Sequence, residues 1–202
     1  MKGILFKPDM IQAIRDKRKT VTRRVIKPQP KGNMYPEMLV AAPCDIPTGR
    51  WVEMLGTIMI DHKPRYQVGE TVYIKEAFRY IQGGGEVHDF GVWYKLDGEY
   101  KWWRDNGGIM NYPINEKNRS PLFMPVWAAR YFIKITGVSA GRVQEITDED
   151  ALAEGVYGDE SYEQATPVMC YEALWDSINK DYQWESNPWV FRYEFEVLEK
   201  SD

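Results

Sequence analysis

The stretch KRKTVTRRVI, residues 17–26, joins a strongly basic turn to an alternating segment rich in β-branched residues. Five of its first eight residues are Lys or Arg, whereas the whole chain of 202 residues has a formal net charge of −4. The alternation predicts a strand over 20–26, on which Thr20, Thr22 and Arg24 share one face. The turn before this strand is either a solvated loop or a site for an anionic group, and the segment alone leaves both interpretations open.

Length and composition favour one globular domain with insertions. A chain of this length is more typical of one domain than of two, and its 44% of hydrophobic residues argues against global disorder. The charge is uneven, with a net +8 in residues 1–31 and a net −13 in residues 145–202. A basic end of this kind can contact phosphates, but mutual neutralisation of the two ends within the fold explains the same pattern.

The sequence also limits the compartment and the cofactors. No apolar run reaches membrane-spanning length and the first residues lack a signal-peptide pattern, so we expect a cytoplasmic protein with no membrane partner. The two Cys residues do not form a disulfide framework. Cys and His residues lack the spacing of a metal site, and glycine-rich phosphate loops are absent. We therefore predict no metal and no organic cofactor.

Local patterns predict an α+β fold built on a small mixed β-barrel or curled sheet with flanking helices. Strands are expected at 3–6, 20–26, 71–75, 130–136 and 187–198, and helices at 8–16, 147–155 and 166–180. Residues from about 31 to 65 are predicted to be irregular, and aromatic-rich strands of an inserted lobe are expected within 86–118.

Caps and periodicity define the last two helices. Thr147 and Thr166 are predicted N-caps, Asp150 completes a capping-box pattern, and Gly155 ends the shorter helix. Helical spacing places five apolar residues on the inner face of the longer helix: Val168, Tyr171, Leu174, Trp175 and Ile178.

Glu154 and Lys19 are candidates for proton-transfer chemistry. Glu154 lies in the last turn of a short helix, where its charge opposes the helix dipole unless a cation is near. Lys19 stands among other cations, which lower the pKa of a lysine and favour its free amine. Thr22 carries a hydroxyl three residues later, so a Lys–Thr pair oriented by a Glu can form an activated nucleophile. The competing interpretation is that Glu154, Lys19 and Thr22 are ordinary surface residues, which the same spacing allows.

Two adjacent tryptophans, Trp102 and Trp103, should face opposite ways if they lie in a strand. One of them would then be exposed, and an exposed aromatic near basic residues can stack on a nucleobase. Core packing is the competing interpretation for either one.

Six blocks of the sequence, in this order, resemble the ASCH domain, a branch of the PUA-like superfamily with many larger members in phages and prophages. They are AIRDKRKTVTRRVIKPQP, VGETVYIKEAF, MPVWAARYFIKIT, ITDEDALAEGV, YEALWDSIN and NPWVFRYEF. The resemblance implies one ASCH/PUA-like domain over 1–202, with insertions at 31–65 and 81–118. It also implies a small β-barrel, a cleft for a nucleobase or RNA, and a bacterial or phage-infected host.

The usual ASCH motif is Gly-x-Lys-x-x-Glu-x-Arg, whose Lys and Arg fall on Lys19 and Arg24. Lys17 occupies the glycine position and Thr22 the glutamate position. With this departure the segment resembles the bacterial N4-acetylcytidine amidohydrolases, which have Arg-Lys-Thr-x-Thr at the same place in the motif. The resemblance implies a catalytic set of Lys19, Thr22 and Glu154.

We therefore predict recognition of a modified cytidine-type base, free or in RNA, with hydrolysis of an N4-acyl amide. The residues expected to bind the substrate or nucleic acid are Lys17, Arg18, Arg23, Arg24, Trp102 and Trp103. A non-catalytic RNA- or DNA-binding module and a phage protein with a protein partner are the two alternatives.

Overall fold

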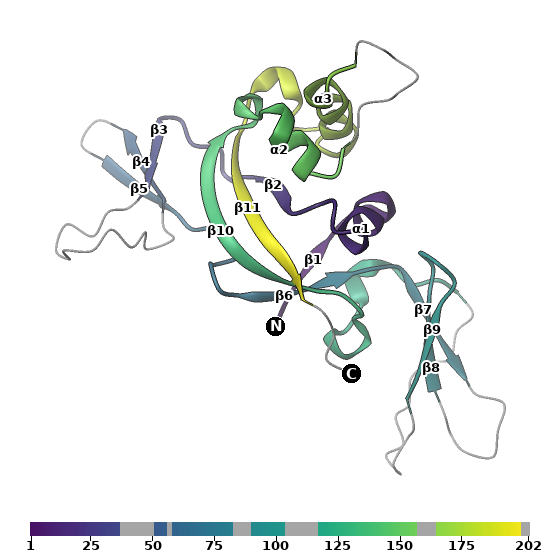
Figure 1. The fold of residues 1–202 in the computed structure, drawn as a ribbon. Helices are drawn as coiled ribbons and strands as arrows, with labels where there is room; N and C mark the ends of the chain where they lie inside the picture. The colour runs from purple at the N-terminus through teal and green to yellow at the C-terminus, as the bar shows by residue number, and fades with distance from the viewer. Residues whose placement is uncertain (37–50, 56–57, 83–89, 104–116, 157–164, 199–202) are drawn as a thin grey trace. The chain divides into compact units, whose positions relative to one another are not determined.

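The computed structural model describes residues 1–36, 51–55, 58–82, 90–103, 117–156 and 165–198, and Figure 1 traces the chain. These residues form a mixed fold of many strands and few helices, which confirms the α+β class. By its contacts the chain divides into two compact units. The first comprises residues 1–12, 71–133 and 198–202, and the second comprises residues 13–70 and 134–197.

The first unit contains a parallel strand pair and an antiparallel sheet. β1 (Lys2–Leu5) pairs in parallel with β6 (Thr71–Lys75). The antiparallel sheet has the order β7 (Phe78–Gln82), β8 (Phe90–Tyr94), β9 (Tyr100–Trp103). Phe78, Tyr80, Val92 and Tyr94 lie on one face of this sheet and form a buried core with Met124 and Ala128. The strands expected within 86–118 are present at 90–94 and 100–103, whereas 83–89 and 104–116 lie outside the described residues.

The sheet of the second unit joins strands from the two halves of the sequence. β10 (Phe132–Arg142), β11 (Trp189–Leu198) and β2 (Val21–Val25) are neighbours in that order, and Figure 1 shows β10 and β11 curving side by side. β2 runs antiparallel to β11, with Thr22 opposite Tyr193 and Arg24 opposite Phe191. β10 begins two residues later than predicted and continues to Arg142.

A second sheet shows that the predicted irregular stretch at 31–65 was wrong. β3 (Asn33–Pro36), β4 (Trp51–Leu55) and β5 (Ile58–His62) form an antiparallel sheet. Its anchor is the buried Glu53, which accepts hydrogen bonds from the backbone N–H of Lys31 (2.5 Å) and Gly32 (2.6 Å) and contacts His62 Nε2 (2.9 Å). Burial alone raises the pKa of Glu53, but the hydrogen bonds from His62, Gly32 and Lys31 outweigh it and lower that pKa. These contacts join residues that are well separated in the sequence. The local pattern of these short strands, which lie among prolines, was therefore not enough to predict the sheet.

The helices begin where their caps predict. α1 (Pro8–Arg15) starts at a proline, α2 (Asp148–Ala153) follows the N-cap Thr147, and α3 (Pro167–Ile178) follows the N-cap Thr166. Tyr171 and Trp175 of α3 are buried in a cluster with residues of α2 and the sheet. Ile178 is 41% exposed, so its predicted place on the inner face was wrong; it is the last residue of α3 and lies beyond that cluster. The short 3₁₀ helices are Pro121–Phe123, Val126–Ala128, Val143–Glu145 and Trp184–Ser186.

None of the described helices has the length and apolar character needed to cross a membrane.

The basic turn begins with a Schellman motif at the end of α1. The backbone N–H of Arg18 donates to the carbonyl of Ala13 (2.8 Å), and that of Lys17 donates to the carbonyl of Ile14 (3.0 Å). This motif requires a left-handed residue at its centre, and Lys17 has φ 58°. The lysine thus adopts the conformation that a glycine would provide at the same position, at a steric cost.

We expect Lys17→Gly to raise the free energy of unfolding by about 0.5–1 kcal/mol, because relief of left-handed strain exceeds the added chain entropy. Urea unfolding would measure the change. Asn187 is a matched control, since it also has a positive φ (43°) and its Oδ1 accepts a hydrogen bond from Gln144 N. Asn187→Gly should give no gain, and a destabilised Lys17→Gly would contradict the strain at Lys17.

Candidate functional site

A buried ion pair joins the basic turn to the end of α2. Lys19 Nζ lies 2.5 Å from Glu154 Oε2 and donates a second hydrogen bond to the backbone carbonyl of Glu154 at 2.7 Å. The two residues are 0% and 2% exposed. The cation expected near Glu154 is therefore present, and it also neutralises the negative end of the helix and occupies one of its last carbonyls.

Backbone contacts hold the two partners in place. The N–H of Lys19 donates to the carbonyl of Ala13 (3.0 Å), and the N–H of Thr20 donates to the carbonyl of Ala153 (2.8 Å). Gly155 follows directly with φ 82°, and a Cβ there would lie 2.9 Å from Ala13 Cβ and 3.1 Å from Lys19 Cβ. Only glycine satisfies both the left-handed backbone and this close approach. The predicted helix-ending glycine is thus also what allows Lys19 to approach the end of α2.

Arg23 extends the ion pair into a network with two carboxylates of α2. Its guanidinium forms an ion pair with Asp150 through Nη2 and donates to Glu154 Oε1 through Nη1 (3.3 Å). Arg192, which is opposite Arg23 in the sheet, donates to Asp150 Oδ1 (2.9 Å). The Asp150 carboxylate therefore forms ion pairs with two arginines, Arg23 and Arg192. Its backbone N–H donates to Oγ1 of the N-cap Thr147 (3.2 Å).

Burial and charge lower the pKa of Lys19. Desolvation is the largest cause; Glu154 opposes it, and the charges of Arg24 and Arg23 add to the lowering. The sequence predicted the direction from crowding by like charges, but burial contributes more. Burial raises the pKa of Asp150, but Arg23 and Arg192 outweigh burial and lower it. A lysine with a lowered pKa next to a carboxylate can accept and return a proton.

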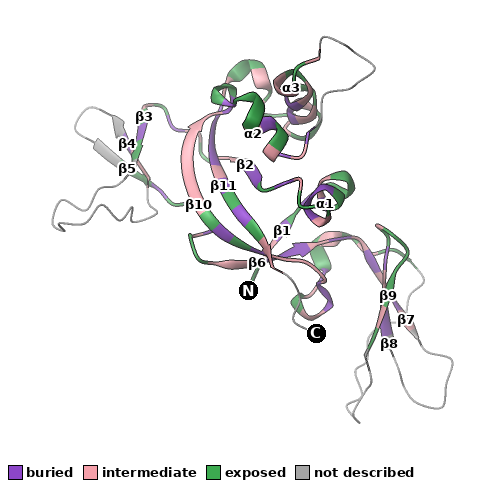
Figure 2. Cartoon of the chain, viewed as in Figure 1, coloured by how far each residue is buried: buried purple, intermediate pink, exposed green. Residues whose placement is uncertain are grey.

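Thr22 is buried in the centre of β2, on the face that regular alternation assigns to Arg24 rather than to Arg23. Figure 2 shows the buried residues along β2 and β11. Within the described residues, no hydrogen bond joins Thr22 to Lys19 or to Glu154. The structure thus brings two of the three predicted catalytic residues into contact, and the third, Thr22, has no hydrogen bond to either of them in the described part of the chain.

Three buried tyrosines surround this region. Tyr171 OH lies 3.5 Å from Glu154 Oε1, and the rings of Tyr66 and Tyr193 meet edge to face at 5.4 Å. Burial raises the pKa of Tyr193 to about 12, and burial together with Glu154 raises the pKa of Tyr171 well above its usual value. All three phenols therefore stay protonated at neutral pH. Arg24 lies within electrostatic range of all three rings and of Glu154.

The outer residues of the basic turn have different surroundings. Lys17 is exposed, while Arg18 is partly exposed and pairs with Asp16 (2.8 Å). Arg23 is only 8% exposed and directs its charge to carboxylates, so the structure does not present it on the surface. Its predicted contact with nucleic acid stays a prediction.

The two tryptophans lie in β9, in the first unit. Trp102 is 43% exposed, as expected for one of the pair; the side chain of Trp103 lies outside the described set. Strand register places Trp102 and Tyr100 on the same face as Trp93 and Arg79. The Arg79 guanidinium stacks on Trp93 at 4.3 Å, and Tyr100 meets Trp102 edge to face at 5.8 Å. We call these four residues the aromatic face.

The sequence analysis did not identify two residues of the candidate site, Asp150 and Tyr171. Asp150 precedes Glu154 by four residues, a spacing that places both carboxylates on one side of a helix, and this signal was available. Tyr171 was assigned to the core from its helical spacing, and nothing local indicated that its hydroxyl reaches Glu154.

No group of three His, Cys, Asp or Glu residues in the described part of the chain could hold a metal ion. The site chemistry is instead that of three cations, Lys19, Arg23 and Arg24, with two carboxylates, Asp150 and Glu154. Such a cluster can exchange a proton and stabilise a negatively charged oxygen.

Comparison with protein-family models, with curated proteins and with solved structures gave no match to this chain.

Proposed function

We propose that this chain is a PUA-like protein of the ASCH type that recognises a modified cytidine-type base and hydrolyses its N4-acyl amide. The observation that carries the proposal is the buried Lys19–Glu154 pair, in which Lys19 has a lowered pKa. The resemblance to the bacterial N4-acetylcytidine amidohydrolases supports the same residues.

In the proposed reaction the Thr22 hydroxyl attacks the acyl carbon and its proton passes to Lys19, which reacts as the neutral amine that its lowered pKa favours. The tetrahedral oxyanion is stabilised by Arg24, and the bond to the cytosine nitrogen breaks as that nitrogen takes a proton from the Lys19–Glu154 pair. Water then hydrolyses the acyl ester on Thr22. Because Lys19 is completely buried, turnover requires the side chains around it to open for the substrate.

The test is incubation of the full chain with N4-acetylcytidine, with longer N4-acylcytidines and with an RNA oligonucleotide containing N4-acetylcytidine. Release of the free acid and the unmodified base, detected by mass spectrometry, is the expected result. Absence of turnover on every member of this panel would remove the hydrolase proposal.

The aromatic face favours a second function, the binding of single-stranded RNA. Tyr100 and Trp102 are 62% and 43% exposed on a sheet that also presents Arg79. Aromatic rings on an open sheet stack on bases without reading their sequence, and a nearby guanidinium suits the phosphates. This function needs no catalysis, so it corresponds to the binding-module alternative.

We expect Trp102→Ala to weaken binding of a short single-stranded RNA by about 1–3 kcal/mol, because one base loses its stacking partner. Fluorescence anisotropy of a labelled oligonucleotide would measure the loss. Leu122→Ala is the matched control, since Leu122 is also an exposed large hydrophobic residue (60%) of the first unit but is not part of the aromatic face. Equal affinities for the wild type and Trp102→Ala would argue against stacking on this face.

A further inference from the structure

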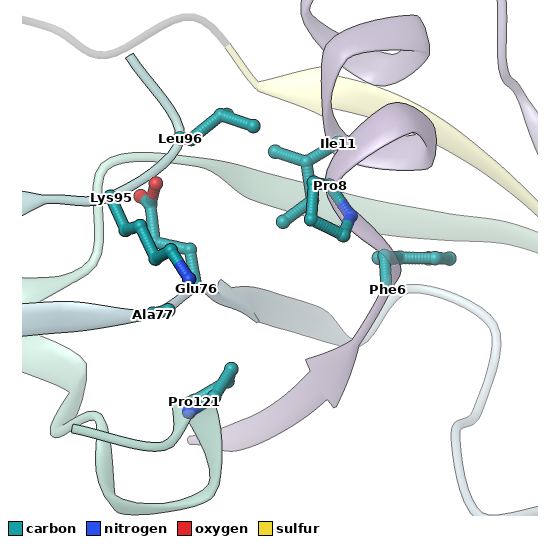
Figure 3. A pocket seen from close by; sticks show the side chains of 8 residues that line it. All are labelled: Phe6, Pro8, Ile11, Glu76, Ala77, Lys95, Leu96 and Pro121. Carbon is teal, nitrogen blue, oxygen red and sulfur yellow. The ribbon is translucent and has the colours of Figure 1, made fainter. Parts of the chain in front are cut away.

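A pocket of about 300 Å³ lies within the first unit. Figure 3 shows Glu76, Ala77 and Lys95 across the pocket from Phe6, Pro8 and Ile11, with Leu96 and Pro121 completing the lining. Six of these eight residues are apolar, and several contribute rigid rings. A cavity of this size, mostly apolar with a few polar groups, is typical of a small-molecule site.

The two charged residues of the lining differ in their surroundings. Glu76 is 2% exposed and receives a bidentate contact from Arg130, whose Nε lies 2.9 Å from Oε1 and whose Nη2 lies 2.6 Å from Oε2. Arg130 in turn stacks on Tyr94 at 3.9 Å and contacts Asp97. This bidentate contact holds the Glu76 carboxylate in one orientation. Lys95 is exposed, with its side chain extending along the pocket.

These charges restrict what the pocket can accept. A carboxylate ligand would meet Glu76, and an ammonium ligand would meet Lys95, so a ligand of either sign encounters a like charge. Burying an unpaired charge among the apolar residues would add a further cost. A neutral group that both donates and accepts fits better, because an N–H can donate to a Glu76 oxygen, which accepts more than one hydrogen bond, while a carbonyl accepts from the Lys95 ammonium.

We propose that this pocket binds a small ring-bearing carboxamide, or a heterocycle with adjacent N–H and C=O groups, with the ring against Phe6 and Pro8. The proposal concerns a site distinct from Lys19 and Glu154 and does not depend on the hydrolase function. A single-ring ligand is also the size that the cavity volume allows.

The test compares benzamide, benzoate and benzylamine, three probes of nearly equal shape and different charge, by protein-detected NMR titration of the full chain. We expect benzamide to bind with a dissociation constant on the order of 1 mM, and the two charged probes to bind at least about tenfold more weakly. Benzoate or benzylamine binding as tightly as benzamide, or benzamide failing to bind at millimolar concentration, would overturn the proposal.

Two variants locate the site. Ala77→Leu fills the cavity and should weaken benzamide binding at least about tenfold. Lys95→Met keeps the length of an exposed side chain but removes its charge, so it should fold normally, weaken benzamide binding about three- to tenfold and improve benzylamine binding. Unchanged benzamide affinity in Ala77→Leu, or unchanged probe selectivity in Lys95→Met, would overturn the proposal as well. N4-Acylcytidine turnover in either variant reports separately on the proposed hydrolase site.

Discussion

Glu154→Ala is expected to destabilise the folded protein by about 3–5 kcal/mol, because it leaves the fully buried Lys19 without its carboxylate. Among the described residues, the loss also removes one of the two carboxylates that contact Arg23, and the group that Tyr171 OH contacts. Urea unfolding at neutral pH, followed by tryptophan fluorescence, would measure the change. The effect concerns stability and is expected whether or not the protein is an enzyme.

A double variant tests the physical cause. Lys19→Met combined with Glu154→Leu replaces the ion pair by apolar groups of similar size, and buried pairs replaced in this way often lose little or no stability. We therefore expect the double variant to be several kcal/mol more stable than Glu154→Ala. If Glu154→Ala unfolds at the same urea concentration as the wild type, the pair contributes nothing to the fold.

The pH dependence gives the same test a second readout. The pKa of Lys19 is lower in the folded protein than the unfolded value of 10.5, so between these two values the unfolded chain binds more protons. Stability contributed by Lys19 therefore increases as the pH rises toward 10.5. Glu154 raises the pKa of Lys19, so the removal of Glu154 lowers that pKa further. The pH range over which Lys19 adds stability then becomes wider. The Glu154→Ala variant should thus recover part of its lost stability at alkaline pH.

Local signals predicted most elements because their causes are local. Pro8 and Thr166 mark helix starts, and residues 71–75 form the predicted strand β6 with the same bounds. Two other predicted strands, at 20–26 and 187–198, are present as β2 and β11, and they pair antiparallel in one sheet. Alternating patterns identify a buried strand without identifying its neighbour, and here both strands had clear patterns.

The features that sequence reasoning missed depend on distant contacts. The β3–β5 sheet depends on Glu53, whose partners lie on both sides of it in the sequence. The burial of Arg23 depends on Asp150, 127 residues away. The left-handed backbone of Lys17 conflicts with its residue type, because no lysine pattern predicts a positive φ. In the candidate site, the charges were visible in the sequence, but their pairing was not.

Thr22 offers the sharpest test of the chemistry. If its hydroxyl is the nucleophile, Thr22→Val should lower kcat/KM for N4-acylcytidine by a factor on the order of 10³ or more, while Thr22→Ser should retain turnover because the hydroxyl remains. Val keeps the branched shape that β2 buries, so both variants should remain folded. Circular dichroism and urea unfolding would check this, and mass spectrometry of rapidly quenched wild type should detect an acyl group on Thr22.

The geometry makes the opposite result equally informative. Thr22 makes no hydrogen bond to Lys19 or Glu154 among the described residues, and alternation places it on the other face of β2 from Arg23, which contacts Glu154. If Thr22→Val keeps full turnover, the attacking group is a water activated by the Lys19–Glu154 pair, and no acyl-threonine forms. Lys19→Met separates that case from binding alone. It should abolish turnover under either nucleophile, whereas RNA binding through Tyr100 and Trp102 should be unchanged.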